Sequence, residues 1–225
     1  MCGRFALVIP KKYQAFVMDL DLSFLNEPGE TLLPRYNISP GQMIPVLVQT
    51  SETLVVAMHW GYRPHWIPGF DKELINAKSE TIDTKSVFRP AFNKNRCLIL
   101  SSGFYEWKKV GTKKQPYYFF LPEHPVFAFA GIFSSPDPKQ PLIGGTAAIL
   151  TTSPNDLVST VHDRMPVILT REKARRWIQD TDTESLKTFF APYPTQEMKA
   201  YEVSQIVGNS RIDNEELIQP VDRLL

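Results

Sequence analysis

Residues 97–107 read Cys97-Leu98-Ile99-Leu100-Ser101-Ser102-Gly103-Phe104-Tyr105-Glu106-Trp107. The apolar run that opens this stretch is typical of a strand buried on both faces. Glu106 then lies among aromatic side chains, which would exclude water from the carboxylate and raise its pKa toward a value useful for general acid–base chemistry. Alternation along a strand would instead turn Glu106 to solvent, where it would pair with Lys108. The stretch predicts a buried sheet and one candidate catalytic residue.

Apolar or aromatic runs of the same kind recur along the chain, each bounded by turn residues. Besides 97–100, they span Ile44 to Gln49, Thr53 to Trp60, Tyr117 to Leu121, Val126 to Phe133, Thr146 to Thr151 and Val167 to Leu169. Fewer segments carry helix signals, namely Lys11 to Leu20, Ser153 to Val161, Arg171 to Gln179 and Glu184 to Phe190. Because strands dominate without alternating with helices, we expect an α+β fold with a mostly antiparallel, barrel-like sheet core flanked by a few short helices. We expect residues 1–225 to form one domain.

The composition is ordinary for a soluble globular protein, since 43% of the 225 residues are hydrophobic and 22% are charged. No apolar run is long enough to span a bilayer, and the amino-terminal stretch lacks a secretory signal pattern. The only cysteines, Cys2 and Cys97, fit a reducing compartment rather than a disulfide scaffold. We therefore expect a cytoplasmic or nucleoid-associated protein without membrane contact, in which Cys97 is a core residue.

A basic segment runs from Thr84 to Pro122 in a chain whose formal net charge is only +1. Glu106 is its one acidic residue, set against eight basic residues, Lys85, Arg89, Lys94, Arg96, Lys108, Lys109, Lys113 and Lys114. Aromatic residues cluster near the segment, namely Trp60, Tyr62, Trp66, Phe88, Phe92 and Trp107. This combination indicates a groove for single-stranded nucleic acid. The alternative is a solvated hairpin turn at 108–114 with the aromatic rings in the core.

The chain opens with Met1-Cys2-Gly3-Arg4-Phe5. Removal of the initiator methionine would leave Cys2 with a free α-amine beside its thiol, and such an amine has a pKa of roughly 7.7–8.0. A 1,2-aminothiol condenses with an aldehyde through an imine and closes to a thiazolidine, which neither group does alone. The alternative for Cys2 is a small buried hydrophobic residue.

Two further polar residues interrupt apolar stretches, where an unsatisfied polar group would cost free energy. His162 is a candidate proton shuttle near neutral pH, or a histidine that caps a helix end. Asn76 would orient an amine through its side-chain carbonyl, or satisfy a turn.

His59 and His65 are six residues apart, and the chain has no Cys-x-x-Cys, His-Glu-x-x-His or glycine-rich phosphate loop. We therefore expect neither a metal nor a cofactor.

Several blocks of the chain, taken in order, resemble the SOS response-associated peptidase (SRAP) family. The blocks are Met1 to Phe5, Arg35 to Gly41, Trp60 to Tyr62, Ile75 to Thr81, Gly103 to Lys108, His162 to Leu169 and Glu216 to Val221. The ordered set is far more specific than any single block, and it spans essentially the whole chain.

The resemblance implies a protein that binds single-stranded DNA at abasic sites and links itself covalently to the sugar aldehyde. Carried onto matching positions, Cys2 is the nucleophile and Asn76 orients its amine, while Glu106 and His162 move protons. The implied DNA surface comprises Arg4, Asn37, Pro40, Trp66, Lys78, Phe92 and Lys108. We expect the protein to be a monomer.

Two positions depart from the family's pattern. Lys78 stands where arginine is frequent, which replaces a bidentate phosphate contact by a point charge. Ile67 stands where a second tryptophan is frequent. Both departures concern DNA contact rather than the nucleophile.

Two other functions remain open from the sequence. A cysteine peptidase would use Cys2 as nucleophile, His162 as base and Asn76 as orienting group, and the resemblance also implies autocatalytic removal of residues that precede the cysteine. A non-catalytic single-strand binding module would need only the basic segment and the aromatic residues.

Overall fold

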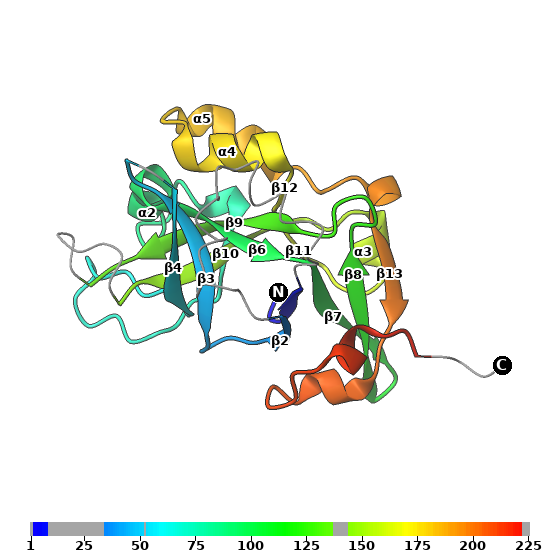
Figure 1. Cartoon of the computed structure of the whole chain (residues 1–225). Coiled ribbons are helices and arrows are strands. Elements are labelled where there is room, and N and C mark those ends of the chain that lie inside the picture. Colours follow the sequence, from blue (N-terminus) through cyan, green and yellow to red (C-terminus); the bar gives the residue numbers. More distant parts are fainter. Residues whose placement is uncertain (1, 9–33, 52, 137–143, 222–225) are drawn as a thin grey trace, which may run out of the picture.

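The computed structural model describes residues 2–8, 34–51, 53–136 and 144–221, so the helix expected at 11–20 lies outside the described residues. One of its two sheets has five strands in the order β13-β8-β7-β1-β2, and all neighbours are antiparallel (Figure 1). These strands are β1 (Phe5–Leu7), β2 (Arg35–Ile38), β7 (Gly103–Val110), β8 (Lys113–Phe120) and β13 (Lys199–Glu202).

The second sheet closes on itself, because β3 pairs with β4 and β6, β6 with β9, β9 with β10, and β10 with β4. Closure leaves no open edge around these five strands. Among the strands of the described residues, only the β10–β4 and β10–β5 pairs are parallel, so the expected α+β fold with a mostly antiparallel, barrel-like core is confirmed. The strands are β3 (Met43–Gln49), β4 (Thr53–Trp60), β5 (Asn76–Lys78), β6 (Arg96–Ser101), β9 (Phe127–Ser134), β10 (Thr146–Thr152), β11 (Met165–Pro166) and β12 (Ile168–Leu169).

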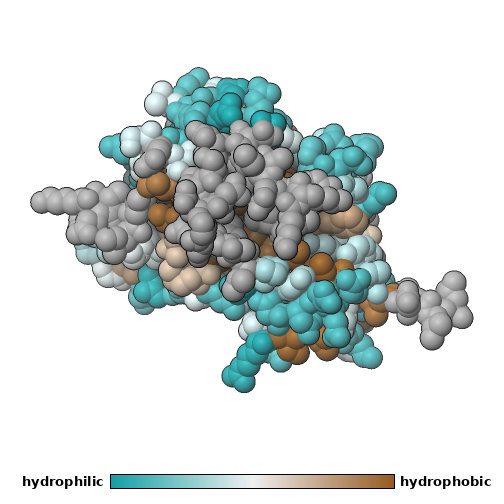
Figure 2. Space-filling view, in the orientation of Figure 1, coloured by the Kyte–Doolittle hydropathy of each residue, from teal (hydrophilic) through white to brown (hydrophobic). Residues whose placement is uncertain are grey.

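The helices are short and flank the sheets, and α4 and α5 form a mainly hydrophilic cap at the top of Figures 1 and 2. The α-helices are α2 (Arg89–Lys94), α3 (Asp156–Ser159), α4 (Arg171–Gln179) and α5 (Thr183–Leu186). The 3₁₀ segments are η3 (Ser79–Thr81), η4 (Lys187–Phe190), η5 (Thr195–Glu197), η6 (Gln205–Gly208) and η7 (Glu215–Ile218). None of the helices in the described ranges is long and apolar enough to cross a membrane.

Two helix starts differ from the sequence prediction because another residue provides the cap. The helix α3 begins at Asp156 rather than near Ser153, since the Asn155 side chain accepts a first-turn backbone N–H at 2.9 Å. The predicted 184–190 helix starts at Thr183 with Asp182 as its cap, and continues as η4 rather than as α-helix.

Two hydrophobic cores pack against opposite faces of β1 and β7. Phe5 and Phe104 belong to the larger core, which includes residues from every strand of the closed sheet. Ala6 and Tyr105 belong to a smaller core shared with the C-terminal segment, together with Tyr118, Val203, Val207 and Leu217. Because successive side chains alternate along a strand, residue 106 shares the face of Phe104 and points toward the larger core.

Gly103 provides a test of how tightly β7 packs. A Cβ at this position would lie 2.3 Å from Cζ of Tyr118, whose ring is buried in the smaller core. Overpacking of this kind costs about 1–3 kcal/mol, so Gly103→Ala should lower the melting temperature by several degrees in scanning calorimetry. Gly208→Ala is the matched control, because nothing lies within 4 Å of a Cβ there. An equal loss in both variants would contradict the packing.

Candidate active site

The pairing of β1 with β7 brings Cys2 and Glu106 together. The Tyr105 N–H donates to the Arg4 carbonyl at 3.0 Å. In an antiparallel pair the next opposed positions are Gly3 and Glu106, which places Cys2 beside the carboxylate. Glu106 is only 3% exposed, so the expected desolvated carboxylate is present and the solvent-facing alternative is wrong.

The Cys2 side chain is fully buried, and its sulfur accepts the backbone N–H of Arg4. Burial raises the pKa of the Cys2 thiol above its ordinary value, and the negative charge of Glu106 raises it further. The chain's amino terminus and the Arg4 hydrogen bond oppose this shift to a smaller extent. The thiol is therefore protonated at neutral pH.

Burial also controls the Glu106 carboxyl. Loss of solvation raises the pKa of Glu106 to about 8, with the amino terminus opposing the shift and Asp163 adding to it. Most Glu106 side chains therefore carry a proton at neutral pH. A carboxyl of this kind can donate a proton and, once ionised, accept one.

His162 completes a cluster with Glu106. It lies just beyond α3, and its Nε2 is 3.8 Å from Oε2 of Glu106. Its Nδ1 accepts the Arg164 backbone N–H at 3.0 Å and lies 3.0 Å from Oδ1 of Asp163. Burial lowers the pKa of His162, helped by the charge of the amino terminus and opposed by Asp163. The imidazole is therefore neutral at neutral pH.

Asn76 lies at the start of β5, where it pairs with Ile149 of β10. Both the oxygen and the nitrogen of its carboxamide are buried, and neither makes a hydrogen bond to any residue that the structure describes. A buried amide without partners is costly. Its carboxamide therefore has unused hydrogen-bonding capacity, and among the described residues no hydrogen bond joins it to Cys2, Glu106 or His162.

Arg4 and Asn37 bind the C-terminal segment. Arg4 Nη1 donates to Oδ1 of Asn37 and to the Val207 carbonyl, both at 2.6 Å. Asn37 is fully buried, and its Nδ2 donates to the carbonyls of Asn209 and Ile212. Both side chains therefore hold the amino-terminal strands to the end of the chain, and Arg4 also lies over the Trp107 ring, 5.9 Å from its centroid.

The other residues expected to contact DNA differ in their exposure to solvent. Pro40 and Lys78 are exposed, whereas Trp66 and Lys108 are partly buried. Phe92 is fully buried, and its ring centroid lies 5.9 Å from that of Trp177 and 6.0 Å from that of Phe190. A ring in this position has no face on which a base could stack, so we leave Phe92 out of the DNA surface. Cys97 is buried as expected, in β6.

Sequence reasoning missed the ion pair between Glu80 and Arg164. Both residues lie inside blocks that carried the family resemblance, four residues after Asn76 and two after His162. This closeness in sequence to two candidate site residues is the signal that would have found them.

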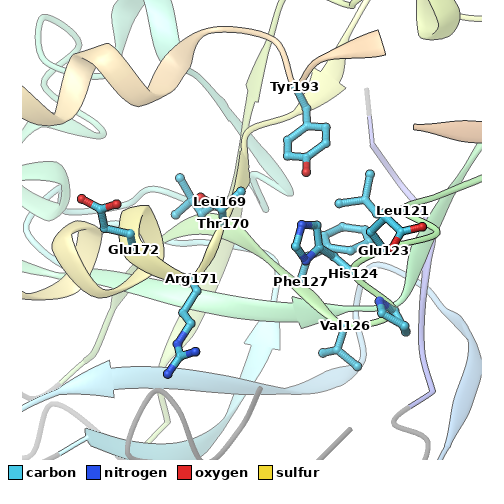
Figure 3. Close-up of a pocket in the computed structure, with 11 residues that line it drawn as sticks. Leu121, Glu123, His124, Val126, Phe127, Leu169, Thr170, Arg171, Glu172 and Tyr193 are labelled. Atoms are coloured by element: carbon cyan, nitrogen blue, oxygen red, sulfur yellow. The ribbon is translucent and has the colours of Figure 1, made fainter. Parts of the chain in front are cut away.

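The described residues contain no group of three or more His, Cys, Asp or Glu side chains that could hold a metal ion. A pocket of about 340 Å³ lies elsewhere, between the turn that joins β8 to β9 and the start of α4 (Figure 3). It has an apolar lining with charged side chains beside it, and its lining residues are Leu121, Glu123, His124, Pro125, Val126, Phe127, Leu169, Thr170, Arg171, Glu172 and Tyr193. None of the candidate site residues lines it.

The fold and site define a class of α+β proteins in which a cysteine beside the amino terminus adjoins a buried carboxyl and an imidazole. The model of the SOS response associated peptidase (SRAP) family matches residues 1–210. This chain belongs to that family.

Its relatives cover nearly the whole chain. Abasic site processing protein YoqW of Bacillus subtilis (strain 168) is 34% identical over 225 residues, covering 97% of this chain and 99% of the relative. Abasic site processing protein YedK of Escherichia coli (strain K12) is 33% identical, covering 98% of this chain and 100% of the relative. A crystal structure of a Bacteroides thetaiotaomicron protein has the same fold, with a TM-score of 0.77 at 24% identity over 98% of this chain and 100% of that one.

Replacement of Glu106 by glutamine should stabilise the protein at alkaline pH. Below pH 4.5, the ordinary pKa of the carboxyl, residue 106 is protonated in both the folded and the unfolded state. Between pH 4.5 and about 8 the carboxyl of the unfolded chain loses its proton while that of the folded protein keeps it, which favours unfolding. Above about 8 the folded state carries the whole cost of a buried charge. Thermal melts of Glu106→Gln should exceed wild type by several degrees near pH 9 and match it more closely near pH 4. The exposed Glu123→Gln is the control; a difference independent of pH would contradict the burial of an ionisable carboxyl.

Proposed function

We propose that this protein binds abasic sites in single-stranded DNA and forms a thiazolidine crosslink through Cys2 after removal of Met1. The observation that carries the proposal is the cluster of Cys2, Glu106 and His162, because it sets a proton-holding carboxyl and a neutral imidazole beside the residue that becomes an aminothiol once Met1 is removed. Relatives that cover 97% and 98% of this chain are named abasic site processing proteins, which supports the substrate.

The α-amine of Cys2 is the first nucleophile in this proposal. A reference pKa of roughly 7.7–8.0 leaves on the order of a tenth of such an amine neutral at pH 7, whereas burial raises the pKa of the thiol and keeps it protonated. The neutral amine attacks the aldehyde of the ring-opened deoxyribose, and loss of water from the resulting carbinolamine gives a Schiff base. The Asn76 carboxamide orients the amine by accepting one of its N–H groups.

Glu106 supplies and takes up the protons of these steps. Its carboxyl protonates the ring oxygen as the closed sugar opens, and the ionised form removes a proton from the attacking amine. His162 relays protons between Glu106 and the sugar oxygen, a role supported by the 3.8 Å separation of Nε2 and Oε2.

Ring closure makes the adduct durable. The sulfur of Cys2 adds to the carbon of the protonated imine while the thiol proton passes to ionised Glu106, and the iminium nitrogen becomes a neutral ring N–H. Amine, thiol and aldehyde together lose one water. Where sulfur addition fails, β-elimination from the imine breaks the strand, which is a lyase side reaction.

In this proposal the DNA strand contacts the exposed Pro40 and Lys78 and the partly buried Trp66 and Lys108. Lysines neutralise phosphates and an accessible indole edge contacts bases, as in other single-strand sites. Arg4 and Asn37 act indirectly in this proposal, because their hydrogen bond helps to hold β1 and β2, which lie between Cys2 and Pro40 in the sequence.

A peptidase activity is the second candidate, favoured by the family's description. A cysteine peptidase attacks with a thiolate, whereas burial raises the pKa of the Cys2 thiol. We therefore confine this candidate to the peptide bond that precedes Cys2 and do not propose general proteolysis.

Mass spectrometry of Met1-free protein incubated with a uracil-glycosylase-treated oligonucleotide tests the crosslink. The expected product has the mass of protein plus oligonucleotide minus one water and resists hydrolysis. Cys2→Ala should retain imine formation and strand cleavage but give no hydrolysis-resistant adduct, while Cys97→Ala should still crosslink. A durable adduct from Cys2→Ala would refute ring closure by the thiol.

Retention of Met1 should abolish the reaction without abolishing binding. The Cys2 nitrogen is then part of a peptide bond and cannot form an imine. Gel-shift and crosslinking assays before and after methionine aminopeptidase treatment should show DNA binding in both samples and a covalent adduct only after treatment. Equal crosslinking by the two samples would rule out the amine as nucleophile.

A further inference from the structure

Glu80 and Arg164 form a two-pronged ion pair. Arg164 Nη1 donates to Oε1 of Glu80 at 2.5 Å, and Nη2 donates to Oε2 at 2.8 Å. Nη2 also donates to the Thr151 carbonyl of β10 at 2.6 Å. The hydrogen bond from Arg164 lowers the pKa of Glu80, so the carboxylate stays ionised. Bidentate pairs of this kind fix orientation as well as charge.

The pair joins two segments that carry candidate site residues. Glu80 lies in η3, directly after the strand β5 that begins with Asn76. Arg164 lies two residues after His162, and its main-chain N–H donates to Nδ1 of that imidazole at 3.0 Å. Both segments lie against β10, since β5 pairs with this strand and Arg164 binds its Thr151 carbonyl.

The orientation of His162 depends on the main chain at Arg164. The Arg164 N–H requires a lone pair on Nδ1, which leaves the ring proton on Nε2 facing Glu106. The Asp163 carboxylate, 3.0 Å from Nδ1, favours a proton on that atom instead. Movement of residue 164 would therefore change the tautomer as well as the direction of the ring.

We propose that Glu80 is a positioning residue, which by holding Arg164 keeps His162 directed toward Glu106 and keeps Asn76 in place beside β10. The effect of Glu80 on rate rests on the proposed crosslinking function, whereas its effect on the His162 ring does not. The Glu80 side chain is 49% exposed, and exposed ion pairs contribute little to stability. Its loss should therefore change geometry more than folding.

Glu80→Gln tests this role in single-turnover reactions of Met1-free protein with saturating abasic oligonucleotide. Adduct formation should slow by about tenfold or more, as for other small misplacements of catalytic groups, with DNA affinity and melting temperature close to wild type. Glu184→Gln is the matched control, because Glu184 is likewise an exposed carboxylate in an ion pair, 2.8 Å from Nζ of Lys187, and this pair includes no candidate site residue. An unchanged rate in Glu80→Gln, or a loss confined to DNA affinity, would overturn the proposal.

The imidazole ¹⁵N spectrum of His162 in DNA-free protein gives a second readout. Wild type should show a neutral ring with an unprotonated Nδ1, and Glu80→Gln should shift proton density toward Nδ1 and move the ring pKa. The titratable groups that bear on this ring include the amino terminus, Asp163 and Glu106. Failure of the wild-type protein to crosslink would refute the proposed function, but the His162 spectrum would still test the positioning role of Glu80. Identical His162 spectra in wild type and Glu80→Gln would overturn that role.

Discussion

The burial of Glu106 beside Cys2 is the constraint on which the rest of the site depends. A carboxyl in water is ionised at neutral pH, but loss of solvation raises the pKa of this one to about 8. Cys2 and His162 lose solvation in the same cluster, which favours the protonated thiol and the neutral imidazole. Of these three groups, only the carboxyl would be in a different charge state in water at neutral pH, and the proton that burial keeps on it is typical of sites built for acid–base chemistry.

The fold supports this burial by enclosing β1 and β7 between two cores. The larger core belongs to the closed sheet, and the smaller one to the C-terminal segment near the lower edge of Figure 1. Arg4 reaches that segment through Asn37 and the Val207 carbonyl, so the end of the chain helps to hold the strand that follows Cys2. A site made by the second residue of the chain thereby rests on contacts with residues more than 200 positions away.

The sequence predicted the five strands of the closed sheet well because each is an apolar run between turn residues, and it found Glu106 because a carboxylate interrupts a run of aromatic residues. The strands β1, β2, β5 and β13 match none of the predicted runs, because they are short and three of them carry polar side chains. The sequence predicted a barrel-like core but not which strands close it, since the parallel pairing of β10 with β4 joins residues that no local pattern connects. The family resemblance predicted Phe92 on the DNA surface. Its ring instead packs against Trp177, a contact that only the tertiary structure reveals. The Glu80–Arg164 pair was missed for the same reason, because 84 residues separate the partners.

The proposed chemistry requires above all a protonated carboxyl next to Cys2 at neutral pH. A ¹³C NMR titration of the Glu106 side-chain carboxyl measures this directly. We expect a midpoint near pH 8, the value to which burial raises the pKa of Glu106. A midpoint near the ordinary pKa of 4.5 would mean a solvated carboxylate and would contradict the proposed role of burial.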